Sequence, residues 1–190
     1  MAIVVVGGSG RDVGKTALVC GLIAALPEFA WTAVKITSHL HGLAEPIWEE
    51  TTPGNGTDTA RYLAAGAHRA LLTTAPQEDS SPERDFPRLI NDLRARLGSG
   101  ANILFESNRI LDYLLPDLCL IVRFRAEHAA PVKPSFSLAA RHAHAMVERA
   151  ESDRMLTEGP KPVFQLVNLE RLSPEMMAWL TRKLGPAPRP

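Results

Sequence analysis

Short apolar runs alternate with helical patterns along the whole chain. Runs of strand character stand at 3–6, 31–35, 68–73, 102–105, 117–124 and 163–167. Helical patterns lie between them at 14–26, 58–65, 89–97 and 137–150, and Ser173-Pro174-Glu175 opens a last helix. Strands joined by helical crossovers favour a mostly parallel sheet with helices on both faces. We therefore predict a single three-layer α/β domain over residues 1–185, followed by a disordered tail at 186–190.

Two longer segments show neither pattern. Residues 75–84 are polar and contain proline, and residues 36–56 are rich in Gly, Pro, His and Thr. A loop as long as 36–56 in a compact domain commonly binds ligands. We expect it to be a binding loop.

The first strand leads directly into a glycine-rich turn, Gly8-Ser9-Gly10-Arg11-Asp12-Val13-Gly14-Lys15-Thr16, and then into the first helix. This order is typical of a phosphate-binding loop of a nucleoside triphosphate site. Glycines let backbone N–H groups approach phosphate oxygens, Lys15 supplies a positive charge, and Thr16 supplies a hydroxyl ligand for Mg²⁺. The predicted nucleotide contacts are Gly8, Gly10, Arg11, Asp12, Val13, Gly14, Lys15, Thr16 and Ala17.

The loop is one residue longer than the common pattern. Ser9 stands where the first glycine is expected, and Gly8 lies six positions before Gly14. A glycine-rich turn that carries Gly-Lys-Thr by chance is the alternative. The strand before the loop and the helix after it favour the phosphate loop.

A phosphate loop needs an acid that holds magnesium at the end of a neighbouring strand. Glu106 directly follows the apolar run 102–105, whereas Asp112 and Asp117 follow no such run. Asp58 stands at the start of a helix after a flexible turn and is a second candidate. We predict a magnesium site of Thr16, Asp58 and Glu106. The alternatives are that Glu106 is a solvated acid and that Asp58, or Thr57 before it, only caps the helix.

Two further side chains are candidates for contact with the nucleotide. Lys35 ends the second strand, which we expect beside the first, so its ammonium group could reach the phosphates or an anionic substrate; otherwise it extends to solvent. The chain has no Asn-Lys-x-Asp or Thr-Lys-x-Asp run that reads guanine. Asn168, at the end of the last strand, is therefore the best candidate for reading the base.

Composition excludes several classes of protein. The chain has 21 basic and 21 acidic residues without a Lys/Arg block, which argues against nucleic-acid binding. No stretch reaches the ~18 apolar residues of a membrane span, and the short apolar start is not a signal peptide. We expect a soluble, cytoplasmic protein. Cys20 and Cys119 lie in apolar runs and are expected to be buried thiols.

Histidine occurs in two closely spaced pairs, His39 with His41 and His142 with His144. Residues two apart in a loop, or on different sides of a helix, have weak spacing for a shared metal ion. We interpret these histidines as surface or substrate-contact residues.

The glycine-rich loop resembles that of dethiobiotin synthetase, which has the same longer G-x5-G-K-T form. That family also has a lysine that ends the second strand, a glutamate at a strand end and a metal-binding aspartate, matched here by Lys35, Glu106 and Asp58. In the family a proline follows the lysine, whereas Ile36 and Thr37 follow it here. This resemblance implies an ATP-dependent ligase or small-molecule kinase.

The first 125 residues or so are more similar to the molybdopterin-guanine dinucleotide biosynthesis protein B family. The matching features are Lys35 before His39 and His41, the stretch Gly56-Thr57-Asp58-Thr59, Arg61, and Ala65-Gly66-Ala67. Histidine does not directly follow the lysine here, and Ser107-Asn108 follow Glu106 in place of the usual glycine. The resemblance implies a GTP-binding accessory factor in molybdenum cofactor biosynthesis, a homodimer with slow Mg²⁺-dependent hydrolysis.

Within that interpretation the expected catalytic residues are Lys15, Lys35 and Asp12, the last as the nearest candidate for activating water. Partners would be a molybdopterin-type cofactor or the enzymes that make it, with no nucleic acid and no membrane. A third hypothesis is a non-enzymatic nucleotide switch that docks a partner protein, with 36–56 as the moving loop. GTP preference favours the accessory factor, and ATP preference favours the ligase or kinase.

Overall fold

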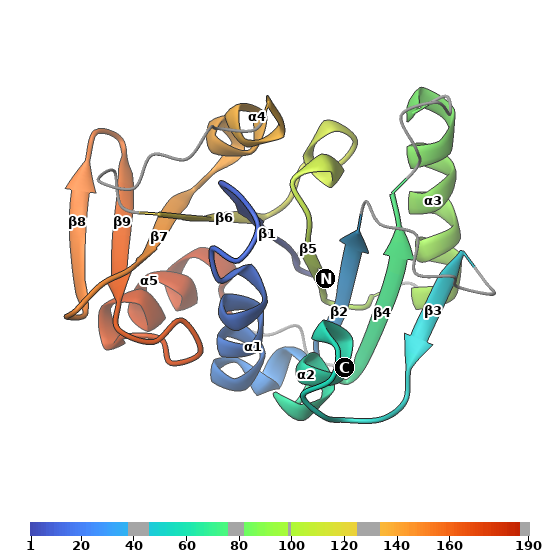
Figure 1. Cartoon of the computed structure of the whole chain (residues 1–190), viewed down its shortest axis with the longest axis horizontal. Helices are drawn as coiled ribbons and strands as arrows, with labels where there is room; N and C mark the ends of the chain where they lie inside the picture. Colours follow the sequence, from blue (N-terminus) through green and yellow to red (C-terminus); the bar gives the residue numbers. More distant parts are fainter. Residues whose placement is uncertain (38–45, 76–81, 99, 125–133, 187–190) are drawn as a thin grey trace.

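The computed structural model describes residues 1–37, 46–75, 82–98, 100–124 and 134–186 (Figure 1). Among these residues, nine strands form one sheet in the order β3-β4-β2-β5-β1-β6-β7-β9-β8. The strands are β1 (Ile3–Gly8), β2 (Thr32–Thr37), β3 (Ile47–Glu50), β4 (Arg69–Thr74), β5 (Ile103–Glu106), β6 (Leu118–Arg123), β7 (Ala145–Arg149), β8 (Arg154–Glu158) and β9 (Lys161–Leu166). The edge strands β3 and β8 pair antiparallel with β4 and β9, and the other pairs are parallel.

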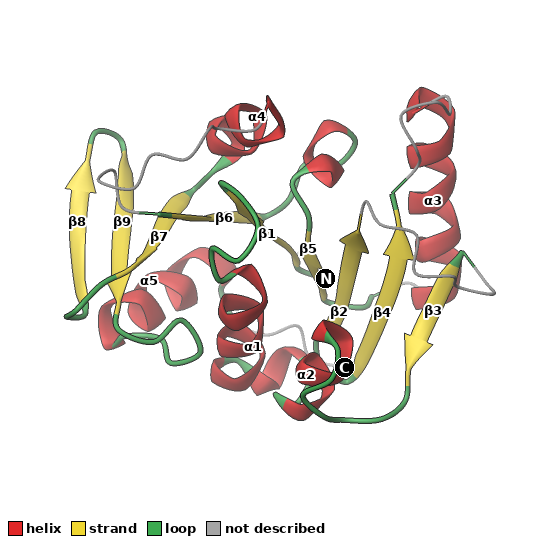
Figure 2. Cartoon of the chain, in the orientation of Figure 1, coloured by secondary structure: helices red, strands yellow, loops and turns green. Residues whose placement is uncertain are grey.

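Helices cover both faces of this sheet (Figure 2). One face carries α1 (Lys15–Ala25), α2 (Asp58–Ala64) and α5 (Pro174–Leu184), with the short 3-10 turn η1 (Pro27–Phe29) after α1. The other face carries α3 (Pro82–Leu97), the 3-10 turn η2 (Arg109–Asp112) and α4 (Pro134–His142). The predicted fold class, a three-layer α/β domain with a mostly parallel sheet, is confirmed.

The alternation of side chains along β1 divides the core into two layers. Val4 and Val6 pack on the side of α1, α2 and α5, while Val5 packs on the side of α3 and α4. Because both faces are covered, the central strands are buried throughout, as their continuous apolar runs indicate. In α1 the consecutive residues Leu18–Ile23 are buried, so this helix is enclosed on nearly all sides.

Several predicted boundaries agree with the structure. The apolar face of the third helix is buried at Leu89, Ile90 and Leu93, and Gly98 follows that helix with φ of +76°. The hydroxyl oxygen of Ser173 accepts a hydrogen bond from the backbone N–H of Met176 at the start of α5. These agreements follow because capping and periodicity are local properties of the chain. The tail expected at 186–190 lies, apart from its first residue, outside the described residues.

The helix predicted over 137–150 is wrong in its second half. The chain leaves α4 at His142 and enters β7 at Ala145. A short apolar segment is compatible with the spacing of apolar residues in a helix and with that in a strand. Here the backbone pairs with β6 and β9, so the segment forms a strand. Two further strands were not predicted: β3 lies within the expected loop 36–56, and β8 follows β7. Both form sheet edges, where fewer side chains are buried and the apolar pattern is weak.

The expected position of the second strand is also wrong. We expected β2 beside β1, but β5 lies between them and pairs with both. Register brings Lys35 of β2 directly opposite Glu106 of β5. This register brings Lys35 and Glu106 together at the carboxyl ends of β2 and β5.

The two cysteines are buried and free, as expected. Burial raises the pKa of Cys20 to about 11 and that of Cys119 to about 12. Both thiols are therefore protonated at neutral pH and are poor nucleophiles.

Candidate functional site

The glycine-rich loop between β1 and α1 is anchored on both sides of β1, to strand β6 on one side and to the segment after β5 on the other. The backbone N–H of Ser9 donates to the carbonyl oxygen of Val122 at 2.9 Å. On the other side the amide of Asn108 forms two hydrogen bonds with the backbone of Gly8, of 2.8 and 2.9 Å. A side chain at Gly7 would lie 2.6 Å from the oxygen of Asn108, so glycine is needed for this close approach. Asn108 was not among the predicted residues.

Gly14 ends the loop and is the residue before the first turn of α1. Its φ is +103°, and an added Cβ would lie 2.2 Å from the side chain of Leu169, so only glycine fits without strain. Glycine supplies no capping side chain, and within the described part of the chain the start of α1 has no side-chain cap. A helix start of this kind suits an anion, because backbone N–H groups and the helix dipole both favour negative charge there.

Lys15 and Thr16 follow at the start of α1. The ammonium group of Lys15 donates to the carbonyl oxygen of Gly10 at 2.6 Å, so its side chain folds back along the loop. The hydroxyl of Thr16 donates to Glu106 Oε2 at 2.9 Å. Asp12, within the loop, is exposed and has a φ of +57°, which is unusual for a residue with a side chain.

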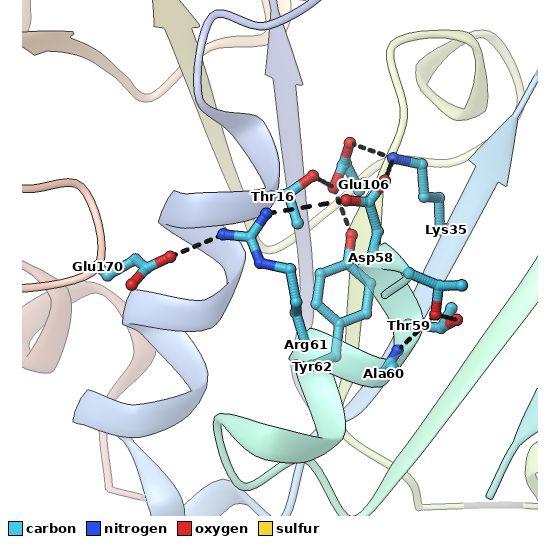
Figure 3. A network of polar contacts seen from close by, with 10 residues as sticks. Thr16, Lys35, Asp58, Thr59, Ala60, Arg61, Tyr62, Glu106 and Glu170 are labelled. Atoms are coloured by element: carbon cyan, nitrogen blue, oxygen red, sulfur yellow. Dashed lines mark hydrogen bonds and ion pairs between the residues drawn. The ribbon is translucent and has the colours of Figure 1, made fainter. Parts of the chain in front are cut away.

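Glu106 is the centre of a polar network (Figure 3). The residue is only 4% exposed, so the alternative of a solvated acid is wrong. Its Oε2 accepts hydrogen bonds from Thr16 and from the fully buried hydroxyl of Tyr62, and its Oε1 accepts from Lys35 at 3.1 Å. A carboxylate buried this deeply needs such partners, because an unpaired buried charge is costly.

Asp58 joins the network from the start of α2. Its Oδ2 accepts a hydrogen bond from Lys35, and its Oδ1 lies 3.9 Å from Arg61 Nη1. Thr57 is the residue that caps α2, because its hydroxyl oxygen accepts from the backbone N–H of Ala60. Asp58 is therefore not the cap, and its carboxylate is directed at Lys35.

Lys35 thus lies between two carboxylates instead of extending to solvent. Burial alone lowers the pKa of Lys35, but the nearby charges and hydrogen bonds of Glu106 and Asp58 outweigh it and raise the pKa above its ordinary value. Burial, followed by the charge of Glu106, raises the pKa of Tyr62 well above its ordinary value. Both groups are therefore protonated hydrogen-bond donors at neutral pH.

The loop and this network line one pocket, which we call pocket 1, of about 660 Å³. It contains most of the predicted site residues: Gly8, Gly10, Arg11, Asp12, Gly14, Lys15, Thr16, Ala17, Lys35, Asp58 and Glu106. It continues past them to Ile36, Thr37, Ala75, Ser107 and Arg109.

A second pocket, pocket 2, lies on the other side of the loop and has a volume of about 640 Å³. Its wall includes two predicted residues absent from the wall of pocket 1, Val13 and Asn168. Asn168 Oδ1 accepts a hydrogen bond from the backbone N–H of Glu170. The residues that line pocket 2 are Asp12, Val13, Gly14, Ala17, Arg123, Phe124, Arg149, Asn168, Leu169 and Glu170.

Every predicted contact residue therefore lines one of the two pockets. Sequence reasoning missed Tyr62 and did not assign Arg61 a role in the site. Tyr62 lies four positions after Asp58 in α2, a spacing that places two side chains on one helix face, so the signal was present. Arg61 also forms an ion pair of 2.7 Å with Glu170, which ties α2 to the segment after β9.

The histidines do not contribute to these pockets among the described residues. His39 and His41 lie outside the described residues. His144 precedes β7, and its Nδ1 accepts a hydrogen bond from the backbone N–H of Cys119. In the described part of the chain no group of three or more His, Cys, Asp or Glu side chains could hold a metal ion. A site of two carboxylates and a hydroxyl is still the kind that Mg²⁺ uses together with phosphate oxygens.

In comparisons with protein-family models, curated proteins and solved structures, nothing matches this chain. Within the described ranges, none of the helices has the length and apolar character needed to cross a membrane.

The fold and the two pockets define the class of this protein. It is an α/β protein with a polar site at the carboxyl ends of its central strands.

Proposed function

We propose that the protein binds a nucleoside triphosphate with Mg²⁺ in pockets 1 and 2 and hydrolyses it slowly. One observation carries the proposal. In pocket 1 the start of α1, which has no capping side chain, lies beside the carboxylates of Asp58 and Glu106, and these already bind the ammonium group of Lys35. An anion-binding element and a cation-binding element side by side suit a metal-bound polyphosphate.

The phosphates would contact the glycine-rich loop. Backbone N–H groups from Gly8 to Thr16 supply donors without bulky side chains, and Lys15 supplies a positive charge. The present contact of the Lys15 ammonium group with the Gly10 carbonyl oxygen places that charge at the loop. These groups would stabilise the charge that develops on the phosphate oxygens.

Thr16, Asp58 and Glu106 would hold magnesium. All three offer oxygen ligands, and Lys35 lies between the two carboxylates at the place where a cation is required, so the donor set fits this ion. When bound there, Mg²⁺ would supply positive charge that offsets the charge of the phosphates. With Mg²⁺ between the carboxylates, the ammonium group of Lys35 would bind the terminal phosphate or an anionic substrate. Asp12 is the candidate for orienting the attacking water, and its exposure is consistent with slow hydrolysis.

Pocket 2 would bind the nucleoside, with Asn168 at the base. We propose GTP in preference to ATP, and a role as an accessory factor in molybdenum cofactor biosynthesis, acting as a cytoplasmic homodimer. This part of the proposal rests on the motif that begins at Lys35 and continues through Gly56-Thr57-Asp58-Thr59. The partners would be a molybdopterin-type cofactor or the enzymes that produce it.

A second candidate function is an ATP-dependent ligase or small-molecule kinase. The observation that favours it is the extension of pocket 1 beyond the loop, over Ile36, Thr37, Ala75 and Arg109. A second reactant in that space would lie next to Lys35. This function requires turnover that depends on an added anionic substrate.

The test is calorimetric titration of non-hydrolysable GTP and ATP analogues with Mg²⁺. Wild type, Lys15→Ala and Lys183→Ala are compared; Lys183 is exposed on α5 and lines neither pocket. We expect Lys15→Ala to weaken binding at least tenfold, because a charge-assisted contact contributes about 1.5–3 kcal/mol, while the control binds normally. GTP preference supports the accessory factor and ATP preference the ligase or kinase. Absence of binding by wild type refutes the proposal.

A further inference from the structure

Glu50, the last residue of β3, accepts hydrogen bonds from both ends of the connection that leads to α2. Its Oε1 accepts from the backbone N–H groups of Thr51 and Thr52, both at 3.1 Å. Its Oε2 accepts from the hydroxyl of Thr57 at 3.1 Å and from that of Thr59 at 3.4 Å. One carboxylate therefore joins the start of the connection to the start of the helix. The nucleotide site described above makes no use of Glu50, which lines neither pocket.

The hydroxyl of Thr57 extends this contact into the first turn of α2. A hydroxyl group has one hydrogen to donate, and that of Thr57 is directed at Glu50. The oxygen of the same hydroxyl accepts from the backbone N–H of Ala60, which is the cap of α2. A hydrogen bond to a charged acceptor is stronger than one between neutral groups. The carboxylate of Glu50 therefore fixes the direction of the group that caps the helix.

The connection between β3 and α2 is an open turn. Apart from chain neighbours, no atom of the described residues lies within 4 Å of a Cβ added at Gly54 or Gly56. Glycine also loses more conformational freedom than any other residue when a turn is ordered. Strand β3, by contrast, is paired with β4, where Glu50 lies opposite Ala70. The hydrogen bonds of Glu50 therefore tie an open turn to a paired strand.

Resting on the proposed function, we propose that Glu50 is a positioning residue for Asp58, one of the three residues proposed to hold Mg²⁺. Thr57 and Thr59 are the chain neighbours of Asp58, so their bonds to one carboxylate hold the chain on both sides of it. The carboxylate of Asp58 is thereby directed at Lys35 (Figure 3). A ligand that is already in place loses less conformational freedom when it binds an ion, so the affinity is higher.

The experiment measures the dissociation constant of the non-hydrolysable analogue, of GTP or ATP, that wild type binds more tightly. Each constant is measured with saturating Mg²⁺ and with a chelator, so that their ratio reports the contribution of the metal ion. Wild type is compared with Glu50→Gln, Glu50→Asp, Asp58→Asn and a double variant that combines Glu50→Gln with Asp58→Asn. The matched control is Glu49→Gln, which removes the same charge one residue earlier, from a side chain that pairs with Arg69 and lines neither pocket. Thermal unfolding establishes that each variant is folded, and two substitutions at the partly exposed Glu50 keep the test open if one of them fails to fold.

With Mg²⁺ we expect Glu50→Gln to weaken nucleotide binding about threefold to tenfold, which corresponds to the cost of ordering one side chain. With the chelator its binding should stay within about twofold of wild type, as should that of Glu49→Gln in both conditions, because a partly exposed charge has little effect at a distance. Glu50→Asp should resemble Glu50→Gln, because the shorter side chain keeps the charge but reaches less far. In the Asp58→Asn background Glu50→Gln should have no further effect, since Glu50 acts through Asp58.

Three results would overturn the inference. Folded Glu50 variants that bind as wild type does would show that the contacts of Glu50 are purely structural. An equal loss in Glu49→Gln would mean that charge alone matters, and an undiminished loss in the Asp58→Asn background would mean that Glu50 does not act through Asp58. If wild type binds the nucleotide more tightly with Mg²⁺ in these cases, the proposed function survives and only the inference fails. If wild type binds no nucleotide, or gains nothing from Mg²⁺, the proposed magnesium site fails with it.

Discussion

Replacing Lys35 with methionine tests whether Asp58 and Glu106 form a cation site. Methionine keeps most of the side-chain volume, so the change removes a charge with little loss of packing. Lys35 Nζ lies 3.1 Å from Glu106 Oε1, and at an effective dielectric constant of ~20 a charge pair at this distance attracts by about 5 kcal/mol.

Part of this attraction is offset. The side chain of Lys35 is 21% exposed and that of Asp58 is 35% exposed, so solvent screens their interaction, and burying the ammonium group has a cost of its own. We therefore expect Lys35→Met to lower the free energy of unfolding by about 2–3 kcal/mol, leaving two facing carboxylates without a cation. Mg²⁺ should restore part of the loss: at a concentration ten times its Kd it stabilises the protein by about 1.4 kcal/mol.

The assay is urea unfolding followed by circular dichroism, with and without Mg²⁺ at constant ionic strength. The matched control is Lys161→Met, because the ammonium group of Lys161 donates only to the backbone oxygens of Ala140 and Arg141 among the contacts in the described part of the chain. Mg²⁺ should not restore its stability. The reasoning is refuted if Lys35→Met is as stable as wild type without Mg²⁺, or if Mg²⁺ stabilises wild type, variant and control equally.

Three further predictions concern stability. Gly21→Ala should destabilise the fold by about 1–3 kcal/mol in urea unfolding, although alanine favours helices, because the new Cβ would lie 2.5 Å from a backbone oxygen after β9; a stable variant would contradict this. Tyr62→Phe should cost about 1.5–3 kcal/mol by the same assay, since a buried hydroxyl donates to the Glu106 carboxylate; an unchanged midpoint would show that this bond contributes nothing. Burial and nearby positive charges lower the pKa of His144, so the unfolded chain binds more protons and the free energy of unfolding falls as pH drops through the ordinary value of 6.5. His144→Asn, which keeps an acceptor for the N–H of Cys119, should reduce this pH dependence in urea unfolding at several pH values, and an unchanged pH dependence would contradict the prediction.

Much of the candidate site could be predicted because its signals are local. The run from Ile3 to Thr16 specifies a strand, a glycine-rich turn and a helix start within a few residues of one another, and the structure has these elements at those positions. Glu106 is predicted because an apolar strand ends there, and a parallel sheet brings the carboxyl ends of such strands together. The two pockets contain all of the predicted contacts for the same reason.

The contacts that join these pieces could not be predicted in the same way. The network around Glu106 depends on β5 lying between β1 and β2, and strand order is a long-range property that the apolar pattern does not encode. The hydrogen bonds that Arg123 and Gln165 donate to Glu148 depend on β7, a segment whose sequence pattern favours the end of a helix. From the sequence alone, a charged residue such as Glu148 in a short segment is expected at the surface. It is buried because β6 and β9 lie on either side of β7.

By itself, then, the sequence determined the α/β class, the glycine-rich turn, the ends of several helices and part of the residues around the two pockets, because periodicity, capping and turn chemistry act over a few residues. Tertiary structure decided which strands are neighbours, where the antiparallel edges lie and which charges pair. The difference is clear for Lys35, Asp58 and Glu106. Each stands at the end or start of a predicted element, but strand register and burial bring their three distant segments together. The charges pair there because an unpaired buried charge would cost too much free energy.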